Sequence, residues 1–392
     1  MVITIGEYVH YMLYLFSGNF MIKRTLNKLI SGRFFKGKAI ILIGPRQVGK
    51  TTLMKNILKN DNYLFLDGDD PTIRNILTEP NTEQLRSIIG DNNLVFLDEA
   101  QRISGIGITL KIITDQFKDV QLLVSGSSSF QLSNQLFEPL TGRKWEYELF
   151  PISWEEFEDH YGYIVSEQKI ENRLLYGFYP EVLNNPGDEK NVLKQLVNSY
   201  LYRDIYAISD IRKPDILEKL VQALALQIGN EVRYNELAQV VGVDKNTIRR
   251  YIDVLRHGYV IFKLSSFSRN LRNEIKKSNK IYFYDNGVRN TILGDFRSID
   301  LRQDKGALWE NFLISERVKQ NTYKNTFANM YFWRTKQQQE VDFVEENEGS
   351  VVGYEFKWHA TRKINLPKTF VDTYNAKTKI IDRSNFREFI IL

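Results

Sequence analysis

The sequence predicts an α/β protein: a parallel sheet flanked by helices, then a helical segment, a helix-turn-helix unit and a second α/β unit. Three observations predict this order. Between residues 25 and 150, short apolar runs alternate with helical patterns, which is typical of a parallel sheet with helices on both faces. A glycine-rich loop connects one of these runs, residues 39–43, to a helical pattern. Near the C-terminus, short strand patterns follow a helical stretch at residues 306–319.

The composition narrows the class of protein. A chain of 392 residues with 43% hydrophobic and 26% charged residues is long enough for two or three domains and ordinary for a globular protein. Because the chain has no cysteine, disulfides, thiolate zinc sites and cysteine nucleophiles are excluded. The four histidines show no ligand spacing, which argues against a zinc site.

Residues 1–20 differ from the rest of the chain. The apolar run from Tyr8 to Phe16 is too short to span a bilayer, and no basic segment or cleavage site accompanies it as in a signal peptide. Met21 begins a segment that reads as a natural start, so we expect residues 1–20 to be an N-terminal extension. We expect a cytoplasmic protein without membrane association.

The run at residues 39–43 is followed by residues 44–51, which match the phosphate-binding motif GxxxxGK(S/T) at every fixed position. Gly44 and Gly49 allow successive N–H groups to converge, and the helix that follows adds its positive dipole end. We expect Lys50 to reach the β- and γ-phosphates of a nucleotide and Thr51 to ligate Mg²⁺.

A buried-strand pattern at residues 93–97 ends in the adjacent carboxylates Asp98 and Glu99. Strands buried on both faces are continuous apolar runs, and ligands of such sheets bind at the carboxyl ends of the strands. We therefore expect Asp98 to hold Mg²⁺ through a water molecule. Glu99 would polarise the water that attacks the γ-phosphate.

A further strand pattern, at residues 120–124, ends in a serine-rich segment. Ser125 and Ser127 are candidates for contacting the γ-phosphate or the attacking water, and a serine-rich turn without this role is the alternative. Arg143 follows, either as an arginine finger that stabilises charge in the transition state or as a surface residue. The residues expected to bind nucleotide are Gly44, Pro45, Arg46, Gln47, Val48, Gly49, Lys50, Thr51, Thr52, Asp98 and Ser127.

Four segments in this order, Gly-Pro-Arg-Gln-Val-Gly-Lys-Thr-Thr-Leu, Leu-Asp-Glu-Ala-Gln, Ser-Gly-Ser-Ser-Ser and Leu-Thr-Gly-Arg, resemble a prokaryotic branch of the AAA-type ATPases. The resemblance covers residues 21 to about 390 and implies ATP and Mg²⁺ as cofactors. It also implies a P-loop NTPase core at residues 21–150 and a helical lid at 151–210. Members of this branch typically end in a domain of unknown function with a restriction-endonuclease-like core, which corresponds to residues 291–392.

Residues 211–290 have a different character. They contain 15 Lys and Arg against 8 Asp and Glu, a net charge of +7, whereas the whole chain carries +5. Two helical patterns, residues 235–241 and 245–255, flank a turn at Gly242, which is the order of a helix-turn-helix. Two strand patterns with a basic loop between them follow, so we expect a winged helix.

The second helix and the basic loop present the residues that DNA binding would require, namely long cations and an amide. A winged helix that makes only protein contacts is the alternative, and the positive charge favours DNA. The residues expected to bind DNA are Lys245, Asn246, Arg249, Arg250, Arg269, Arg272, Lys276 and Lys277.

The last hundred residues contain a second set of carboxylates. Strand alternation places Glu340 and Asp342 on one face, and Glu355 and Lys357 on one face of the next strand. With Glu310 on the preceding helix, these residues resemble the PD-(D/E)xK nuclease pattern. Asp342 and Glu355, helped by Glu310 or Glu340, would hold one or two Mg²⁺ ions, and Lys357 would orient the attacking water. An exposed acidic strand pair, or a nuclease fold without cleavage activity, are the alternatives.

The sequence thus predicts an ATP-hydrolysing protein that acts on DNA, and leaves open whether it also cleaves DNA with Mg²⁺. The alternative is a nucleotide-controlled protein whose C-terminal domain only docks DNA or a partner protein. A small-molecule kinase is disfavoured, because a winged helix follows and no acceptor site is evident. If Arg143 acts on a neighbouring copy, the active form is a homo-oligomer.

Overall fold

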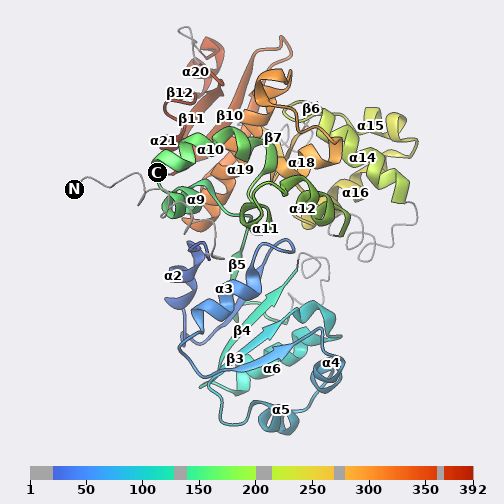
Figure 1. Cartoon of the computed structure of the whole chain (residues 1–392), viewed down its shortest axis with the longest axis vertical. Helices are drawn as coiled ribbons and strands as arrows, with labels where there is room; N and C mark the ends of the chain where they lie inside the picture. Colours follow the sequence, from blue (N-terminus) through green and yellow to red (C-terminus); the bar gives the residue numbers. More distant parts are fainter. Residues whose placement is uncertain (1–20, 128–138, 200–213, 269–278, 360–365, 392) are drawn as a thin grey trace, which may run out of the picture.

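The computed structural model describes residues 21–127, 139–199, 214–268, 279–359 and 366–391. Within these ranges the chain forms two sheets, one of five strands and one of seven, with helices packed around them (Figure 1). The five-stranded sheet and its helices form the lower unit in Figure 1, and the remaining elements form the upper unit. No helix within those ranges is both long and apolar enough to cross a membrane.

The lower unit contains strands β1 Ala39–Ile43, β2 Leu64–Asp67, β3 Leu94–Asp98, β4 Gln121–Gly126 and β5 Lys144–Glu148. They pair in parallel in the order β2-β3-β4-β1-β5, which confirms the predicted parallel sheet. The three central strands are fully buried, because helices cover both faces of their apolar runs. Along β1, Ile40 and Leu42 join one apolar cluster, and Ile41 and Ile43 join another.

The helices of the lower unit are α2 Leu26–Ser31, α3 Lys50–Ile57, α4 Pro71–Leu77, α5 Thr82–Ile89 and α6 Ile106–Gln116. Helix α3 begins where the glycine-rich loop ends, so the loop lies between the carboxyl end of β1 and the amino end of a helix. The predicted strand–loop–helix order is therefore present.

The helical region after β5 contains α9 Trp154–Tyr161, α10 Tyr163–Tyr176, α11 Pro180–Asn184 and α12 Glu189–Leu196. Ser153 begins α9 with a capping box, because its hydroxyl accepts from Glu156 N while the Glu156 carboxylate accepts from Ser153 N. Trp154 N donates to Glu316 Oε2 at 2.7 Å. The start of this region therefore packs on a helix of the C-terminal part.

The next elements are α14 Pro214–Leu226, β6 Glu231–Val232, α15 Tyr234–Val241, α16 Lys245–His257, β7 Ile261–Ser266 and β8 Asn279–Phe283. Helices α15 and α16 flank a turn in which Gly242 has φ 78°, a left-handed conformation that favours glycine. Asp244 begins α16, because its carboxylate accepts from Asn246 N at 2.8 Å and Thr247 N at 3.0 Å. Strands β7 and β8 form an antiparallel hairpin, to which β6 adds a third strand.

The C-terminal elements are α18 Asn286–Leu293, α19 Lys305–Tyr323, β9 Asn329–Arg334, β10 Glu340–Asn347, β11 Ser350–Phe356, α20 Lys368–Tyr374, β12 Lys377–Ile381 and α21 Arg387–Ile390. Strand β9 pairs in parallel with β7, with Ser265 opposite Tyr331 and Ser266 opposite Phe332. One seven-stranded sheet, in the order β12-β11-β10-β9-β7-β8-β6, therefore continues across the boundary that we expected between residues 290 and 291.

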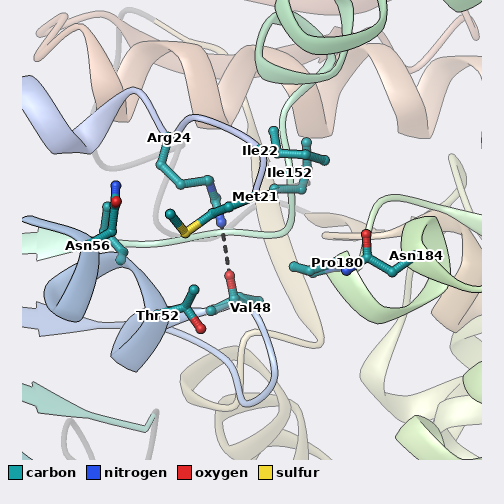
Figure 2. Close-up of a pocket in the computed structure, with 11 residues that line it drawn as sticks. Met21, Ile22, Arg24, Val48, Thr52, Asn56, Ile152, Pro180 and Asn184 are labelled. Carbon is teal, nitrogen blue, oxygen red and sulfur yellow. Dashed lines mark hydrogen bonds between the residues drawn. The ribbon is translucent and has the colours of Figure 1, made fainter. Parts of the chain in front are cut away.

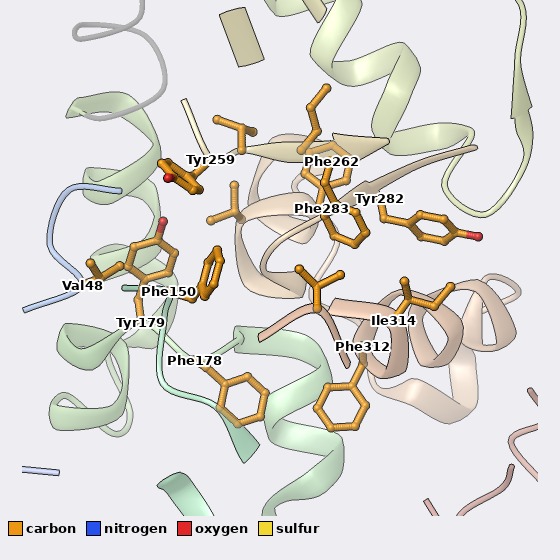
Figure 3. Packing of buried hydrophobic residues seen from close by; sticks show 14 of the residues in the cluster. Val48, Phe150, Phe178, Tyr179, Tyr259, Phe262, Tyr282, Phe283, Phe312 and Ile314 are labelled. Carbon is orange, nitrogen blue, oxygen red and sulfur yellow. The ribbon is translucent and has the colours of Figure 1, made fainter. Parts of the chain in front are cut away.

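Aromatic side chains fill the space where the two units meet (Figure 3). The rings of Phe150 and Tyr284 stack with their centroids 5.4 Å apart, and those of Phe178 and Phe312 stack at 5.9 Å. Since Phe150 follows β5 and Phe312 lies in α19, one continuous apolar cluster joins the lower unit to the C-terminal sheet.

A buried arginine also joins the two units. Arg24 donates to Val48 O at 2.9 Å, to Phe150 O at 2.6 Å, to Glu156 Oε2 at 3.0 Å and to Tyr323 Oη at 3.3 Å. Its side chain is 7% exposed and that of Glu156 is 1% exposed. A buried charge is stable only when it is paired and hydrogen-bonded, so the position of Arg24 constrains all four partners.

We expect Arg24→Met to lower the free energy of unfolding by about 3–5 kcal/mol, because the substitution leaves Glu156 buried without a counter-ion. Chemical denaturation followed by tryptophan fluorescence measures this change. Arg297→Met is the matched control, because Arg297 pairs with Asp295 on the surface and is 65% exposed. Equal free energies of unfolding for the two variants would contradict a stabilising role of the buried Arg24–Glu156 ion pair.

Candidate functional site

The phosphate loop has the backbone that its motif predicts. Gly49 adopts φ 90° and ψ 31° immediately before α3. A Cβ atom at Gly44 would lie 2.1 Å from the carbonyl oxygen of Leu149, so no larger residue fits there. The two glycines are therefore required for different reasons. Gly49 is required for its left-handed backbone conformation, and Gly44 is required because the chain just after β5 approaches it closely.

The Lys50 side chain lies inside this loop. It is 6% exposed, and its Nζ donates to Gly44 O at 3.0 Å and to Pro45 O at 2.8 Å. Burial lowers the pKa of Lys50 to about 8, although the carboxylates of Glu99 and Asp98 act in the opposite direction. An anion in the loop would offer this ammonium group stronger acceptors than two backbone carbonyls.

The carboxyl end of β3 faces the loop. Thr51 Oγ1 donates to Asp98 Oδ2 at 2.7 Å, and the Ser125 hydroxyl donates to the other carboxylate oxygen. Asp98 is 5% exposed and Ser125 is fully buried. The structure thus brings together three side chains that the sequence placed at the ends of different elements.

Glu99 adopts a left-handed backbone conformation, with φ 48° and ψ 40°. The side-chain amide of Gln101 donates to the Glu99 carboxylate, and Gln101 Oε1 accepts from Ser127 N at 3.2 Å. Gln101 therefore connects Glu99 to the serine-rich strand end. We did not expect this role, although the residue is the last one of the Leu-Asp-Glu-Ala-Gln segment.

A cavity of about 280 Å³ opens beside the first turn of α3 (Figure 2). Three segments form its walls: residues 21–24, the phosphate loop with α3, and α11 with the residues before α9. The cavity is lined by Met21, Ile22, Arg24, Val48, Gly49, Thr52, Leu53, Asn56, Ile152, Pro180 and Asn184. Its lining is mainly apolar, with Arg24, Thr52 and two asparagines as the polar side chains, and such a lining suits the flat ring system of a base.

Arg143 lies away from this site. Its carbonyl accepts from Ala39 N at 2.9 Å at the start of β1, whereas the phosphate loop follows the end of that five-residue strand, about 17 Å away. Arg143 pairs with Asp115 at 2.6 Å, and this hydrogen bond lowers the pKa of the Asp115 carboxyl. Arg143 therefore cannot act as a finger on its own loop, and that role would require a second copy of the chain.

Three family models match separate parts of the chain. Residues 36–158 match an AAA domain, residues 167–298 match domain of unknown function DUF8612, and residues 305–388 match domain of unknown function DUF4143. The AAA match covers the phosphate loop, Asp98 and Glu99. Residues 36–158, which we call the ATPase domain, are therefore similar to an AAA domain.

Similar whole proteins and one similar solved structure cover most of this chain. An uncharacterized protein of Mycobacterium tuberculosis is 27% identical over 353 residues, which is 88% of this chain and 76% of that protein. An uncharacterized protein of Methanocaldococcus jannaschii is 24% identical over 344 residues, covering 82% of this chain and 75% of that protein. The structure of a Walker-type ATPase of Pyrococcus abyssi superimposes with a TM-score of 0.50 at 16% identity, covering 70% of this chain and 96% of that one. This last likeness concerns the fold.

Outside the ATPase domain, the carboxylates expected in the C-terminal part also come close together. Glu310 belongs to α19, Asp342 to β10 and Glu355 to β11. Burial, together with the negative charges of Glu310 and Glu355, raises the pKa of Asp342 to about 8. Lys357 Nζ donates to Glu355 Oε1 at 2.7 Å.

The expected Mg²⁺ site at these carboxylates stays a prediction. Across the described ranges, no three Asp, Glu or His side chains are placed to share one metal ion. Lys280 of β8 lies among the carboxylates instead, with its Nζ 2.6 Å from Glu340 Oε1 and 3.3 Å from Glu310 Oε1. Lys280 was not expected from the sequence, because it is distant in the chain and belongs to no motif. The carboxylates expected to hold Mg²⁺ are Glu310, Glu340, Asp342 and Glu355.

The residues expected to contact DNA fall into two groups. Lys245, Asn246, Arg249 and Arg250 lie in or at the start of α16 and are exposed, because the opposite face of this helix is buried in the core. The second group lies outside the described residues and consists of Arg269, Arg272, Lys276 and Lys277.

The lowered pKa of Lys50 predicts proton uptake on ATP binding. At pH 8 about half of the Lys50 amines are unprotonated, and nearby phosphates would raise their pKa, so about half a proton should be taken up per ATP. Titration calorimetry in two buffers of different ionisation enthalpy measures this uptake. Lys50→Arg is the control, since a guanidinium stays protonated at pH 8. Identical binding heats in the two buffers for the natural protein would contradict the prediction.

Proposed function

We propose that the chain binds ATP with Mg²⁺ at residues 44–52 and hydrolyses it. The observation that carries this proposal is the convergence of Thr51, Asp98 and Ser125, beside a buried lysine and a base-sized cavity. A hydroxyl and a carboxylate at one point are the oxygen donors that Mg²⁺ prefers when a nucleotide supplies the remaining ligands. Bound Mg²⁺ would neutralise phosphate charge as it develops.

The side chains of the ATPase domain have distinct roles in this proposal. The N–H groups of the phosphate loop and Lys50 bind and orient the phosphates. The Glu99 carboxylate accepts a proton from the attacking water, and Gln101 holds that carboxylate in place. The apolar walls of the cavity bind the base and exclude water.

We further propose that ATP turnover is coupled to DNA binding at α16. Lys245 and Arg249 are exposed in this helix, and residues 211–290 carry a net charge of +7. The order α14, β6, α15, α16, β7, β8 is that of a winged helix, in which the second helix of the helix-turn-helix enters the major groove. The chain would therefore act as a DNA-dependent ATPase. Docking of a partner protein on α16 is the competing function.

We expect Lys50→Ala to lower ATP turnover by at least ~10²-fold, because the phosphates lose their buried cation. Glu99→Gln should bind ATP normally and lower turnover by about 10²–10⁴-fold, because an amide accepts no proton. Lys55→Ala is the control, since Lys55 is exposed in the same helix. Phosphate release and equilibrium binding of a fluorescent ATP analogue give the two readouts. Turnover at the natural rate in Lys50→Ala would contradict the proposed site.

The DNA proposal is tested by ATP turnover with and without duplex DNA over a range of salt concentrations. Replacing both Lys245 and Arg249 with Ala should weaken DNA binding and reduce the salt slope by about 2, since two phosphate contacts are lost. Replacing Lys111 and Lys118 with Ala removes the same charge from an exposed part of the ATPase domain and should leave the slope unchanged. If DNA changes neither turnover nor the behaviour of these variants, α16 is better explained as a protein-docking surface.

A further inference from the structure

The acidic cluster of the upper unit, defined as Glu310, Glu340, Asp342 and Glu355, contains a buried lysine. Lys280 is 1% exposed, and its ammonium group pairs with Glu310 and Glu340 at 3.3 and 2.6 Å. A lysine this deeply buried remains charged only when carboxylates surround it. Both carboxylates and the lysine are therefore mutually dependent parts of one ion-pair network.

Other groups of the chain also contact the carboxylates of the acidic cluster. The Tyr282 hydroxyl donates to Glu310 Oε1 at 2.6 Å, and Phe356 N donates to Asp342 Oδ2 at 2.8 Å. Lys357 donates to Glu355, and Arg334 lies 3.6 Å from Glu340. Each carboxylate of the acidic cluster thus has at least one donor or cation from the chain itself.

We propose that Lys280 is the resident cation of the acidic cluster, so that this cluster binds no divalent metal ion while Lys280 is in place. A mobile ion would have to approach an ammonium group of like charge at close range and also replace its desolvated contacts. A tethered cation loses far less entropy on pairing than a free one, which favours the lysine further. The nuclease-like residues therefore hold the fold together, and they do not cleave DNA by a metal-assisted route in this conformation.

The location of Lys280 gives the network its structural role. Lys280 and Tyr282 both belong to β8, the hairpin strand that follows the proposed DNA-binding helices, whereas Glu310 belongs to α19 and Glu340 to β10. The acidic cluster thus fastens the hairpin to the C-terminal sheet through paired charges, in addition to the backbone pairing of β7 with β9. This inference is independent of the proposed ATP and DNA functions.

The test is a titration of the full-length protein with Mn²⁺, without nucleotide, in which electron paramagnetic resonance counts the free ion. The variants are Asp342→Asn, Lys280→Met and the combination of the two. The natural protein and Asp342→Asn should bind Mn²⁺ identically, since the acidic cluster contributes no site. Lys280→Met should gain one Mn²⁺ site that binds at least ~10-fold more tightly than the natural protein does. Asp342→Asn, introduced into the Lys280→Met protein, should remove this site. Any binding by the ATPase domain cancels in these comparisons.

Lys263→Met is the matched control, because Lys263 lies in the same hairpin but pairs with Asp253, outside the acidic cluster. It should gain no Mn²⁺ site. If the natural protein binds Mn²⁺ at a site that Asp342→Asn abolishes, the proposal is overturned. This comparison does not depend on whether Lys280→Met folds. A folded Lys280→Met protein, verified by its circular dichroism, that binds no more Mn²⁺ than the natural protein would overturn it as well.

Discussion

The guanidinium of Arg24 is the interaction on which the arrangement of the two units depends. It is buried, and its partners are a phosphate-loop carbonyl, the carbonyl of Phe150 after β5, the carboxylate of Glu156 in α9 and the hydroxyl of Tyr323 at the end of α19. A charge in such a place cannot lose its partners without a large free-energy cost. The phosphate loop, the helical region and the C-terminal unit are consequently held to one another by a residue next to the base-sized cavity.

The features that could be predicted from the sequence are those that local patterns encode. The central strands of the five-stranded sheet lie within one or two residues of their expected positions, because strands buried on both faces are continuous apolar runs. Most of the proposed ATP site was found in the same way. Lys50, Thr51 and Asp98 sit at the ends of elements, and the order of a parallel sheet brings such ends to one edge.

The features that could not be predicted are contacts between distant segments. Neither β7 nor β9 carries a signal for the other, since strand pairing depends on long-range packing and not on local preference. Lys280 was one cation among many in a basic region, and only the folded sheet reveals that carboxylates surround it. Arg143 shows the same limit, because its place in the sequence did not reveal that it lies beside the start of β1, whereas the phosphate loop follows the end of that strand.

Helix α19 fixes the distance between the acidic cluster and the Arg24 contact. Glu310 and Tyr323 both belong to this helix of 19 residues, and their positions lie about 20 Å apart along its axis. One end contacts Arg24 beside the base-sized cavity, and the other contributes to the acidic cluster around Lys280. A helix resists stretching, so the two places keep a constant separation. Any rotation of the ATPase domain against the upper unit must therefore either carry the acidic cluster with it as one rigid piece or break the hydrogen bonds of Arg24.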